Sequence, residues 1–396
     1  MTGPLAGLRV IDLGTRIAAP FCAGLLGEMG AEVIKVEQPG SGDFMREIGP
    51  FEDGYSLFWA VEGRGRKSVT LDLRKPEGQD LFRRLAATAD VVVENFRPGT
   101  LEKWRIEPST CDSRLVWVRI SAFGQDGPYS PRPGLDRVGV AMGGIMHLTG
   151  YPDRPPVRVG ITLTDYLTGT FSSQAALAAL YRRDARDGTG EGAVVDASLY
   201  GAALRILEWT LAAYDRLGVV REREGNRLAN SAPLDNYPTA DGKHVCIVAG
   251  SDANFARLVK AMGQPELRTD PRFDTLPNRA SRSDEINGIV AAWTSSLPAK
   301  DVEAACIEHD VPVATAYSAT DIFSDEHIAA RGDLITVDDP VLGPVRQQAP
   351  FPRFIGSPVE APGGAPRLGA HTRDVLAGVL GLDDAELDHL AAEGIT

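Results

Sequence analysis

The stretch LRVIDLGTRIAAPFCAGLLGEMGAEVIKVEQP, residues 8–39, decides the fold. Its opening residues are mostly apolar and lead to Gly14, which is typical of a strand that ends in a turn. Residues 20–30 are small and apolar and end in Gly30, where a helix can stop. Residues 31–39 return to a strand pattern. The stretch therefore predicts a strand, a helix and a second strand.

The same alternation continues through the first third of the chain. Apolar strand patterns recur at residues 67–73, 90–96 and 115–124. A helix pattern at 76–89 begins with Pro76, which suits the first position of a helix. Short apolar strands that alternate with helices predict an α/β fold whose parallel sheet is covered on both faces.

A dinucleotide-binding Rossmann domain is the first functional candidate for such a sheet. The turn after the first strand reads GTRIAAPF, residues 14–21. It lacks the G-x-G-x-x-G pattern that lets the backbone approach a pyrophosphate. The fold class is therefore kept, but NAD is not expected as a cofactor.

The middle of the chain changes character. Helical patterns cover residues 164–190 and 197–218, and a charged link follows. Residues 237–250 have the pattern of a hairpin that turns at Asp241 and Gly242. Further helix and loop patterns complete what we expect to be a second, smaller α+β domain.

Composition excludes several classes of protein. The chain of 396 residues has a formal net charge of -13, which argues against a nucleic-acid partner because phosphate binding needs a basic field. No apolar run approaches the ~20 residues that cross a bilayer, and the start lacks a signal-type leader, so a cytoplasmic protein is expected. The four cysteines have no CxxC spacing and suggest reduced thiols and no zinc site: Cys22, Cys111, Cys246 and Cys306.

Two local features have more than one interpretation. Arg64, Arg66 and Lys67 form a basic cluster that fits either a solvated loop or a loop that contacts phosphate. Asp165, in VGITLTDYLTG (159–169), precedes a helix of small and apolar residues. By itself that position favours a helix-capping acid, since a carboxylate suits the positive end of the helix dipole.

Several motifs together resemble one family. They occur in collinear order over nearly the whole chain: DLGTRIAAPFCAGLLGEMGAEVIKVEQPGSGD, RKSVTLDLRKPEG, ADVVVENFRPGTLEKW, ISAFGQDGPY, PGLD, VGITLTDYLTG and GAHTRDVL. They look like the class III coenzyme A transferases, which include formyl-CoA transferase and have α-methylacyl-CoA racemase as a relative.

The resemblance implies an interlocked homodimer. Its large Rossmann-like domain would combine residues 1–205 with the C-terminal part of 326–396. Residues 206–229 would be a linker and 230–325 a small α+β domain. The tail, residues 364–394, is expected to form a loop and two short helices.

The resemblance also implies a role for Asp165 as a nucleophile. A carboxylate can attack an acyl-CoA thioester to give an aspartyl-acyl anhydride and then an aspartyl-CoA thioester. This exchange between acyl-CoA and a carboxylic acid requires neither ATP nor a metal. The positive end of the helix would help to hold the carboxylate ionised. The oxyanion and gating loop of the family corresponds to residues 248–255, but Ala249, Gly250 and Ser251 depart from its run of glycines.

The resemblance also implies which residues contact coenzyme A. They lie in two chain segments and at one further position. Gln38 stands where the family often has an arginine near the adenosine. Phe96 and Trp104 also fit plain core packing, whereas the basic side chains suit phosphate. The predicted CoA-binding residues are Gln38, Leu71, Arg74, Asn95, Phe96, Arg97, Lys103 and Trp104.

The racemase relatives have a histidine in a motif that here reads PGLD, residues 133–136. Leu135 cannot exchange a proton, and Asp136 is expected to be a structural or helix-capping acid. Ile17, Ala18 and Leu135 would form an acyl pocket that favours an apolar or larger acyl group over formate. An acyl-CoA:carboxylate CoA-transferase is therefore predicted. The alternatives are a racemase and a non-catalytic acyl-CoA-binding protein.

Overall fold

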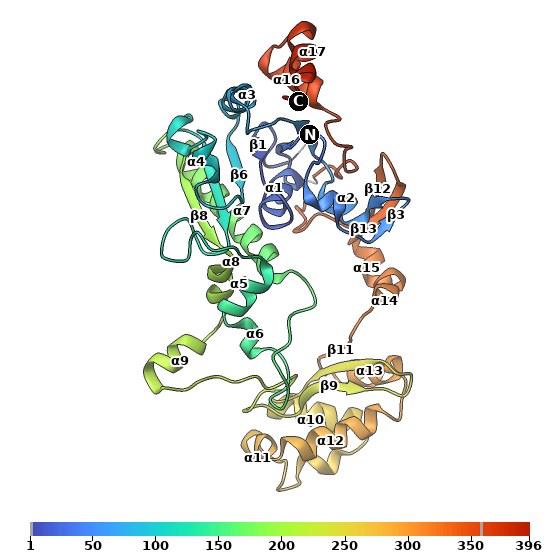
Figure 1. Ribbon diagram of the computed structural model, residues 1–396. Coiled ribbons are helices and arrows are strands. Elements are labelled where there is room, and N and C mark those ends of the chain that lie inside the picture. The colour runs from blue at the N-terminus through green and yellow to red at the C-terminus, as the bar shows by residue number, and fades with distance from the viewer. Residues whose placement is uncertain (1–2, 357–358) are drawn as a thin grey trace. The chain divides into compact units, whose positions relative to one another are not determined.

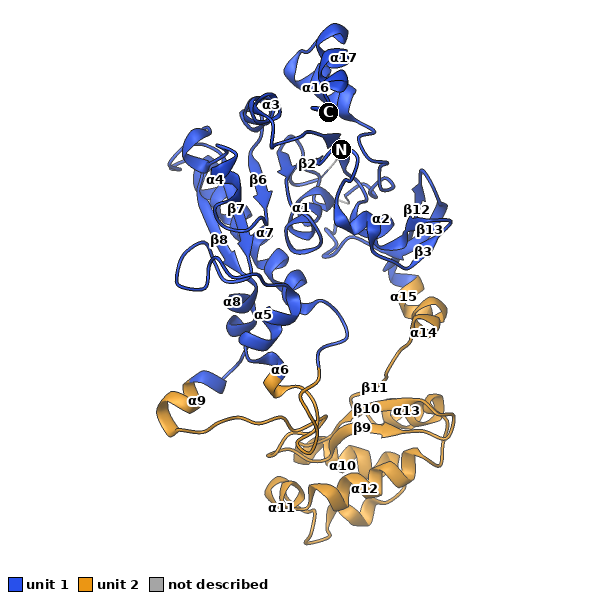
Figure 2. Cartoon of the chain, viewed as in Figure 1, with its two compact units in different colours: residues 1–146, 158–211, 330–396 blue, residues 147–157, 212–329 orange. Residues whose placement is uncertain are grey.

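The computed structural model describes residues 3–356 and 359–396 (Figure 1). The chain forms two compact units (Figure 2). Unit 1 comprises residues 1–146, 158–211 and 330–396, and unit 2 comprises residues 147–157 and 212–329. Both ends of the chain therefore belong to the same unit.

A six-stranded sheet forms the centre of unit 1. Its strands are β1 (Arg9–Asp12), β2 (Glu32–Glu37), β5 (Lys67–Thr70), β6 (Val91–Glu94), β7 (Val116–Ser121) and β8 (Val194–Ser198). The order is β5-β2-β1-β6-β7-β8, and every neighbouring pair is parallel. The prediction of a parallel α/β sheet is confirmed.

Both faces of the sheet are covered because successive strand residues point to opposite sides. In β1, Val10 packs with the helices α1 and α7, whereas Ile11 packs with α3, α16 and α17. The bounds of these helices are α1 (Ala18–Glu28), α3 (Pro76–Ala86), α7 (Leu163–Asp184), α16 (Thr372–Leu380) and α17 (Asp384–Ala392). The predicted helix start at Pro76 and the two short helices of the tail are confirmed.

The C-terminal segment is attached to the β5 edge of the sheet. Thr70 N–H donates to Thr372 Oγ1 at 3.0 Å. Asp72 N–H donates to Ile395 O at 2.7 Å. Segments some 300 residues apart therefore share one core.

The helix predicted over 197–218 is wrong in two respects. Its first two residues belong to strand β8, and the rest divides into α8 (Leu199–Arg205) and α9 (Thr210–Leu217). Ser198 caps α8 by accepting the Gly201 N–H, and Glu208 adopts a left-handed φ of 52°, which no helix can continue through.

Unit 2 contains an antiparallel sheet of order β11-β10-β9. Its strands are β9 (Leu234–Pro238), β10 (His244–Val248) and β11 (Val313–Thr315). The predicted hairpin turn is confirmed: Gly242 has a φ of 77°, and Thr239 N–H donates to Lys243 O. Three helices pack with this sheet around a second core: α10 (Asp252–Ala261), α12 (Ser283–Thr294) and α13 (Ala299–Glu308). A further helix, α11 (Leu276–Ser281), places buried Arg279 over the Phe255 ring of that core.

The remaining elements are short. The strands are β3 (Phe51–Glu52), β4 (Tyr55–Ser56), β12 (Leu334–Asp339) and β13 (Gly343–Gln348). The helices are α2 (Leu57–Glu62), α4 (Thr100–Lys103), α5 (Asp136–Met142), α6 (Ile145–Leu148), α14 (Ala319–Ser324) and α15 (Glu326–Arg331), with 3-10 turns η1 (Phe44–Glu47), η2 (Pro108–Thr110) and η3 (Pro265–Arg268). In the described part of the chain, no helix combines the length and apolarity that a membrane span needs. All four cysteines carry free thiols.

Candidate active site

The carboxyl edge of the parallel sheet gathers most of the predicted site residues. Gly14 to Ala18 follow β1, Gln38 follows β2, Leu71 follows β5, and Asn95 to Arg97 follow β6. The chain moves from β1 to β2 on one side and returns to β6 on the other, so β1 and β6 flank the point where the strand order reverses. Ligands of open α/β sheets bind outside the carboxyl ends of the strands at such a point.

Asp165 lies in the first turn of α7 and is half-buried. Within the described residues, no donor forms a hydrogen bond to its carboxylate. Burial and the nearby carboxylate of Asp136 raise the pKa of Asp165 to about 7, and the charge of Arg16 partly opposes them. Burial and Asp136 therefore oppose any help that the positive helix end gives to the ionised form.

Asp136 supplies the cap that α7 needs. Its Oδ1 accepts the Thr164 N–H at 2.8 Å and the Thr164 Oγ1–H at 2.8 Å. Asp136 is itself buried in the first turn of α5. The expectation that Asp136 is a structural or helix-capping acid is confirmed, although the helix it caps is α7 and not its own helix α5. The capping interpretation of Asp165 is wrong, since its carboxylate makes no cap bond with any described residue.

The loop after β1 is held by side chains from three other segments. Arg16 has a left-handed φ of 67°, which costs a residue with a Cβ roughly 1 kcal/mol. Asp43 accepts the Arg16 N–H at 2.8 Å. Asn95 accepts the Thr15 N–H and donates to the Thr15 carbonyl, both at 2.8 Å. Together these hydrogen bonds compensate for the left-handed backbone of Arg16 and maintain it.

A buried ion cluster supports this loop from inside the sheet, and sequence reasoning missed it. Lys35 is fully buried, and its Nζ lies 3.0 Å from Asp43, 3.4 Å from Asp12 and within bonding distance of the Gly14 carbonyl. Burial alone would lower the pKa of Lys35, but the carboxylates around it raise that pKa. The sequence signal was a lysine inside the apolar strand EVIKVE, since a charge there needs buried partners.

The basic cluster near β5 fits neither interpretation that the sequence left open. Arg66 is buried, donates to the carbonyls of Pro20 and Glu62, and lies 3.6 Å from Asp12. Arg64 pairs with Glu28, and Lys67 pairs with Glu32. The three cations are engaged within unit 1, so the cluster is structural.

Two of the three predicted acyl-pocket residues belong to the core beside Asp165. Ile17 packs in a small cluster with Trp59 and with Tyr166, the residue after Asp165. Ala18 is buried below the turn that carries Asp165. Leu135 lies outside this cluster and is 56% exposed. The structure of the single chain therefore places Ile17 in one cluster with Tyr166 and Ala18 against Gly169 of the same helix, but it does not pack Leu135 with them.

The predicted CoA-binding residues divide into structural and exposed groups. Leu71 is in the core, and the Phe96 and Trp104 rings pack edge to face at 5.3 Å between centroids. Arg74 is exposed and forms two bonds with Asp72, whose pKa they lower to about 2. Two basic residues are exposed without an ion pair among the described residues: Arg97 and Lys103.

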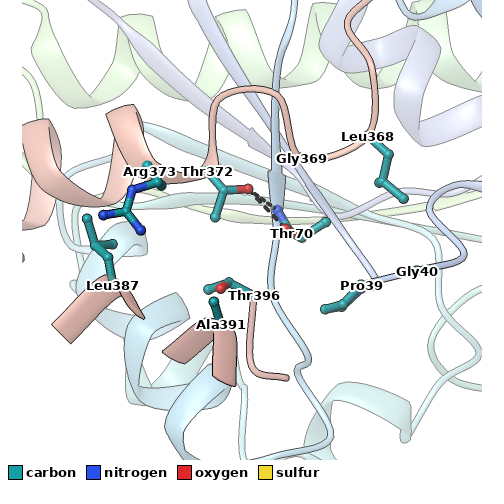
Figure 3. A pocket seen from close by; sticks show the side chains of 10 residues that line it. All are labelled: Pro39, Gly40, Thr70, Leu368, Gly369, Thr372, Arg373, Leu387, Ala391 and Thr396. Carbon is teal, nitrogen blue, oxygen red and sulfur yellow. Dashed lines mark hydrogen bonds between the residues drawn. The ribbon is translucent and has the colours of Figure 1, made fainter. Parts of the chain in front are cut away.

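A cavity of about 330 Å³ lies between the β2 and β5 ends and the C-terminal helices (Figure 3). It contains none of the predicted residues, although Pro39 and Thr70 on its wall adjoin Gln38 and Leu71 in sequence. Its lining is Pro39, Gly40, Thr70, Leu368, Gly369, Thr372, Arg373, Leu387, Ala391 and Thr396.

The predicted oxyanion loop lies in unit 2 and is anchored there. The Ala249 N–H donates to Pro233 O at 3.0 Å, so it is not free for a substrate. Buried Arg279 donates to the Gly250 carbonyl at 2.9 Å. Ser251 caps α10. The N–H groups of Gly250 and Ser251 have no acceptor in the described part of the chain.

Known proteins resemble this chain in fold and in sequence. A crystal structure of a CaiB/BaiF family protein from Brucella suis matches with a TM-score of 0.86 and 33% identity, and covers 96% of this chain and 100% of that one. Succinyl-CoA–D-citramalate CoA-transferase of Chloroflexus aurantiacus is 44% identical over 99% of this chain and 98% of its own. Succinate–glutarate CoA-transferase of Agrobacterium fabrum is 34% identical over 94% and 95%.

The structural match defines the class of fold, that of the CaiB/BaiF proteins. The sequence profile of CoA-transferase family III matches residues 5–372. The chain belongs to CoA-transferase family III and is a class III CoA-transferase.

Proposed function

We propose that the chain transfers CoA from an acyl-CoA to a free carboxylic acid, with Asp165 as the nucleophile. The observation that carries this proposal is a carboxylate without hydrogen-bond donors at the carboxyl edge of the sheet. A carboxylate that has lost hydration without gaining hydrogen bonds is a stronger nucleophile than a hydrated one.

The chemistry follows from one carboxylate. Asp165 Oδ attacks the thioester carbon, the C–S bond breaks, and CoA leaves as a thiolate from an aspartyl-acyl anhydride. The thiolate then attacks Asp165 Cγ, the donor acid leaves, and an aspartyl-CoA thioester remains. The acceptor carboxylate then attacks Asp165 Cγ and releases the CoA thiolate, which leaves a new aspartyl-acyl anhydride. The thiolate attacks the acyl carbon of the acceptor, so that the new acyl-CoA forms and the Asp165 carboxylate is regenerated. Bonds broken and formed are similar in energy, so the exchange is close to balanced.

The binding groups are part of the proposal. Arg97, Lys103 and Arg74 have exposed cations that suit the phosphates of CoA. Gly250 and Ser251 are the candidate N–H donors for an oxyanion. The strand order β5-β2-β1-β6-β7-β8 supports a Rossmann-like description of the sheet, and the resemblance to the family supports an interlocked homodimer.

The substrates are proposed from the relatives. Two names pair succinyl-CoA with a hydroxy-dicarboxylic acid, D-citramalate or L-malate. A third name pairs the dicarboxylic acids succinate and glutarate. Acids of this class are the first to test, and a screen with succinyl-CoA and a set of acceptor acids would be analysed by mass spectrometry.

The experiment that tests the mechanism is to trap the intermediate. Incubation with donor acyl-CoA should leave CoA on the peptide that contains Asp165, and hydroxylamine should convert this thioester to a hydroxamate of defined mass. Asp165→Asn keeps the size of the side chain but lacks the nucleophile, so it should lose at least about 10³-fold in transfer rate.

Two further measurements serve as controls for this test. CoA affinity of Asp165→Asn by calorimetry should stay within a few-fold of wild type, which shows that the site is intact. Near-wild-type transfer by Asp165→Asn, with deamidation excluded by mass spectrometry, would falsify the proposed role of Asp165.

A further inference from the structure

Arg16 is the cation whose charge acts on Asp165, and its guanidinium makes no hydrogen bond or ion pair in the described part of the chain. It is half-buried, with its guanidinium stacked 4.1 Å above the Phe44 ring. It neither forms an ion pair nor donates a side-chain hydrogen bond among residues 3–356 and 359–396. Buried donors in proteins are almost always satisfied, so a half-buried group with five free N–H donors is suited to receive a ligand anion.

The fold maintains Arg16 in an unfavourable backbone conformation. Asp43 accepts a hydrogen bond from the Arg16 N–H, and buried Lys35 forms an ion pair with Asp43. Asn95 forms hydrogen bonds with both the N–H and the carbonyl of Thr15. Backbone conformations of this kind concentrate at ligand-binding sites, because the surrounding structure must compensate for them. A side chain that is held in this way is preorganised, so it loses little entropy when an anion binds.

The position of Arg16 identifies the anion. Ile17 and Tyr166 pack in the same small apolar cluster, so Arg16 and Asp165 are each the sequence neighbour of a residue in that cluster. The acyl carbon must reach Asp165 for the reaction. A second carboxylate on a short acyl chain is then only a few bonds away, whereas the phosphates of CoA lie at the other end of the pantetheine arm.

We infer that Arg16 binds the distal carboxylate of a dicarboxylic acyl group and so selects dicarboxylic monothioesters as substrates. The inference rests on the proposed transfer function and deepens it. The planar guanidinium can bind both oxygens of a carboxylate at once, which a lysine cannot reproduce.

The test compares two donors of equal chain length, succinyl-CoA and butyryl-CoA, which lacks the distal carboxylate. The rate of acid release from each donor is measured with wild type, Arg16→Gly, Arg16→Asn and Arg16→Lys. Glycine and asparagine tolerate the left-handed backbone, so these variants remove the cation without added strain. Thermal unfolding checks that each variant is folded.

Loss of charge-assisted hydrogen bonds should lower kcat/KM for succinyl-CoA roughly 10- to 100-fold in Arg16→Gly and Arg16→Asn. The value for butyryl-CoA should change less than about threefold, and Arg16→Lys should recover only part of the preference. Arg186→Gly is the control, because it removes one exposed arginine beyond the far end of α7, roughly 30 Å away.

The outcomes separate the two levels of the proposal. Equal losses with both donors, together with weaker CoA binding, would mean that Arg16 binds a CoA phosphate and would overturn the inference. An unchanged preference in Arg16→Gly would also overturn it. Failure of the wild-type chain to form any CoA adduct on Asp165 would instead overturn the proposed function.

Discussion

Asp165 is poised near neutrality by its surroundings. Burial removes water from the carboxylate, and Asp136 adds a second negative charge, so the pKa rises to about 7. Because its pKa is raised, a smaller fraction of Asp165 is ionised at a given pH. The ionised form accepts no hydrogen bonds from the described residues that would reduce its nucleophilicity. We therefore expect the pKa of this one residue to set the pH range of the transfer reaction.

We predict that kcat/KM rises with pH up to about 7 and then levels off. Only the ionised carboxylate attacks, and below its pKa the ionised fraction falls about tenfold per pH unit. The measurement is the pH profile of kcat/KM for acid release from the donor. A flat profile from pH 5 to 8 would contradict the assignment.

The variant Asp136→Asn tests whether the pH profile of kcat/KM reports the titration of Asp165. Asparagine can still accept the Thr164 N–H, but it removes the charge that raises the pKa of Asp165, so the profile should move to lower pH. Burial also raises the pKa of Glu94 to about 7, but Glu94 interacts with Arg119 and Glu102 instead. An Asp136→Asn profile that coincides with wild type would point away from Asp165.

At the scale of elements, the contact of α7 with α1 positions the helix that carries Asp165. A Cβ at Gly169 would lie 2.8 Å from the Ala18 carbonyl and 2.9 Å from the Phe21 ring. The absence of a side chain therefore lets α7 approach the start of α1. Phe21 then packs edge to face on Tyr166, whose hydroxyl donates to Glu62 at 2.9 Å.

We predict that Gly169→Ala destabilises the protein by about 1–3 kcal/mol, because the added methyl forces the two helices apart. The rate of transfer should fall as well, since Asp165 is displaced from the loop after β1. Urea denaturation and steady-state kinetics measure the two effects.

Gly378→Ala is the matched control for this change. Gly378 lies within α16, and a Cβ there would meet nothing within 4 Å. Alanine should stabilise that helix by about 0.5–1 kcal/mol and leave transfer unchanged. A similar response of both glycines to alanine would show that helix propensity, and not the contact with α1, governs Gly169.

At the scale of the whole molecule, the single chain leaves an apolar segment exposed. Trp209, Leu211, Tyr214 and Leu217, in and just before α9, are between 52% and 75% exposed. A stable monomer rarely exposes such a group of large apolar side chains. A second copy of the chain, as the family resemblance implies, would cover them.

We predict a homodimer that persists at nanomolar concentration in native mass spectrometry. Interlocked chains separate only when they unfold, so the unfolding midpoint should rise with protein concentration. A folded monomer on dilution, or a midpoint independent of concentration, would be the contrary result.

Local pattern was enough to predict the parallel α/β sheet and the turn at Gly242, whereas the cap that Asp136 gives to α7 depends on tertiary packing. Strand and helix periodicity and turn residues act over a few positions, so they can be detected in one sequence. Strand β8 escaped because VVDAS is a partly exposed strand at the edge of the sheet, and its polar residues interrupt the apolar run. Collinear motifs identified Asp165 and the family, although no spacing rule could have assigned its chemistry.

Only the tertiary structure decided the state of the site. Lys35, Asp43 and Asp12 come together from three segments, and the pKa of Asp165 depends on Asp136 and Arg16, which are distant in sequence. The loss of hydration and the sum of nearby charges depend on which segments pack together. The collinear motifs of the sequence therefore pointed to Asp165, whereas packing determined the loss of hydration and the charges around its carboxylate.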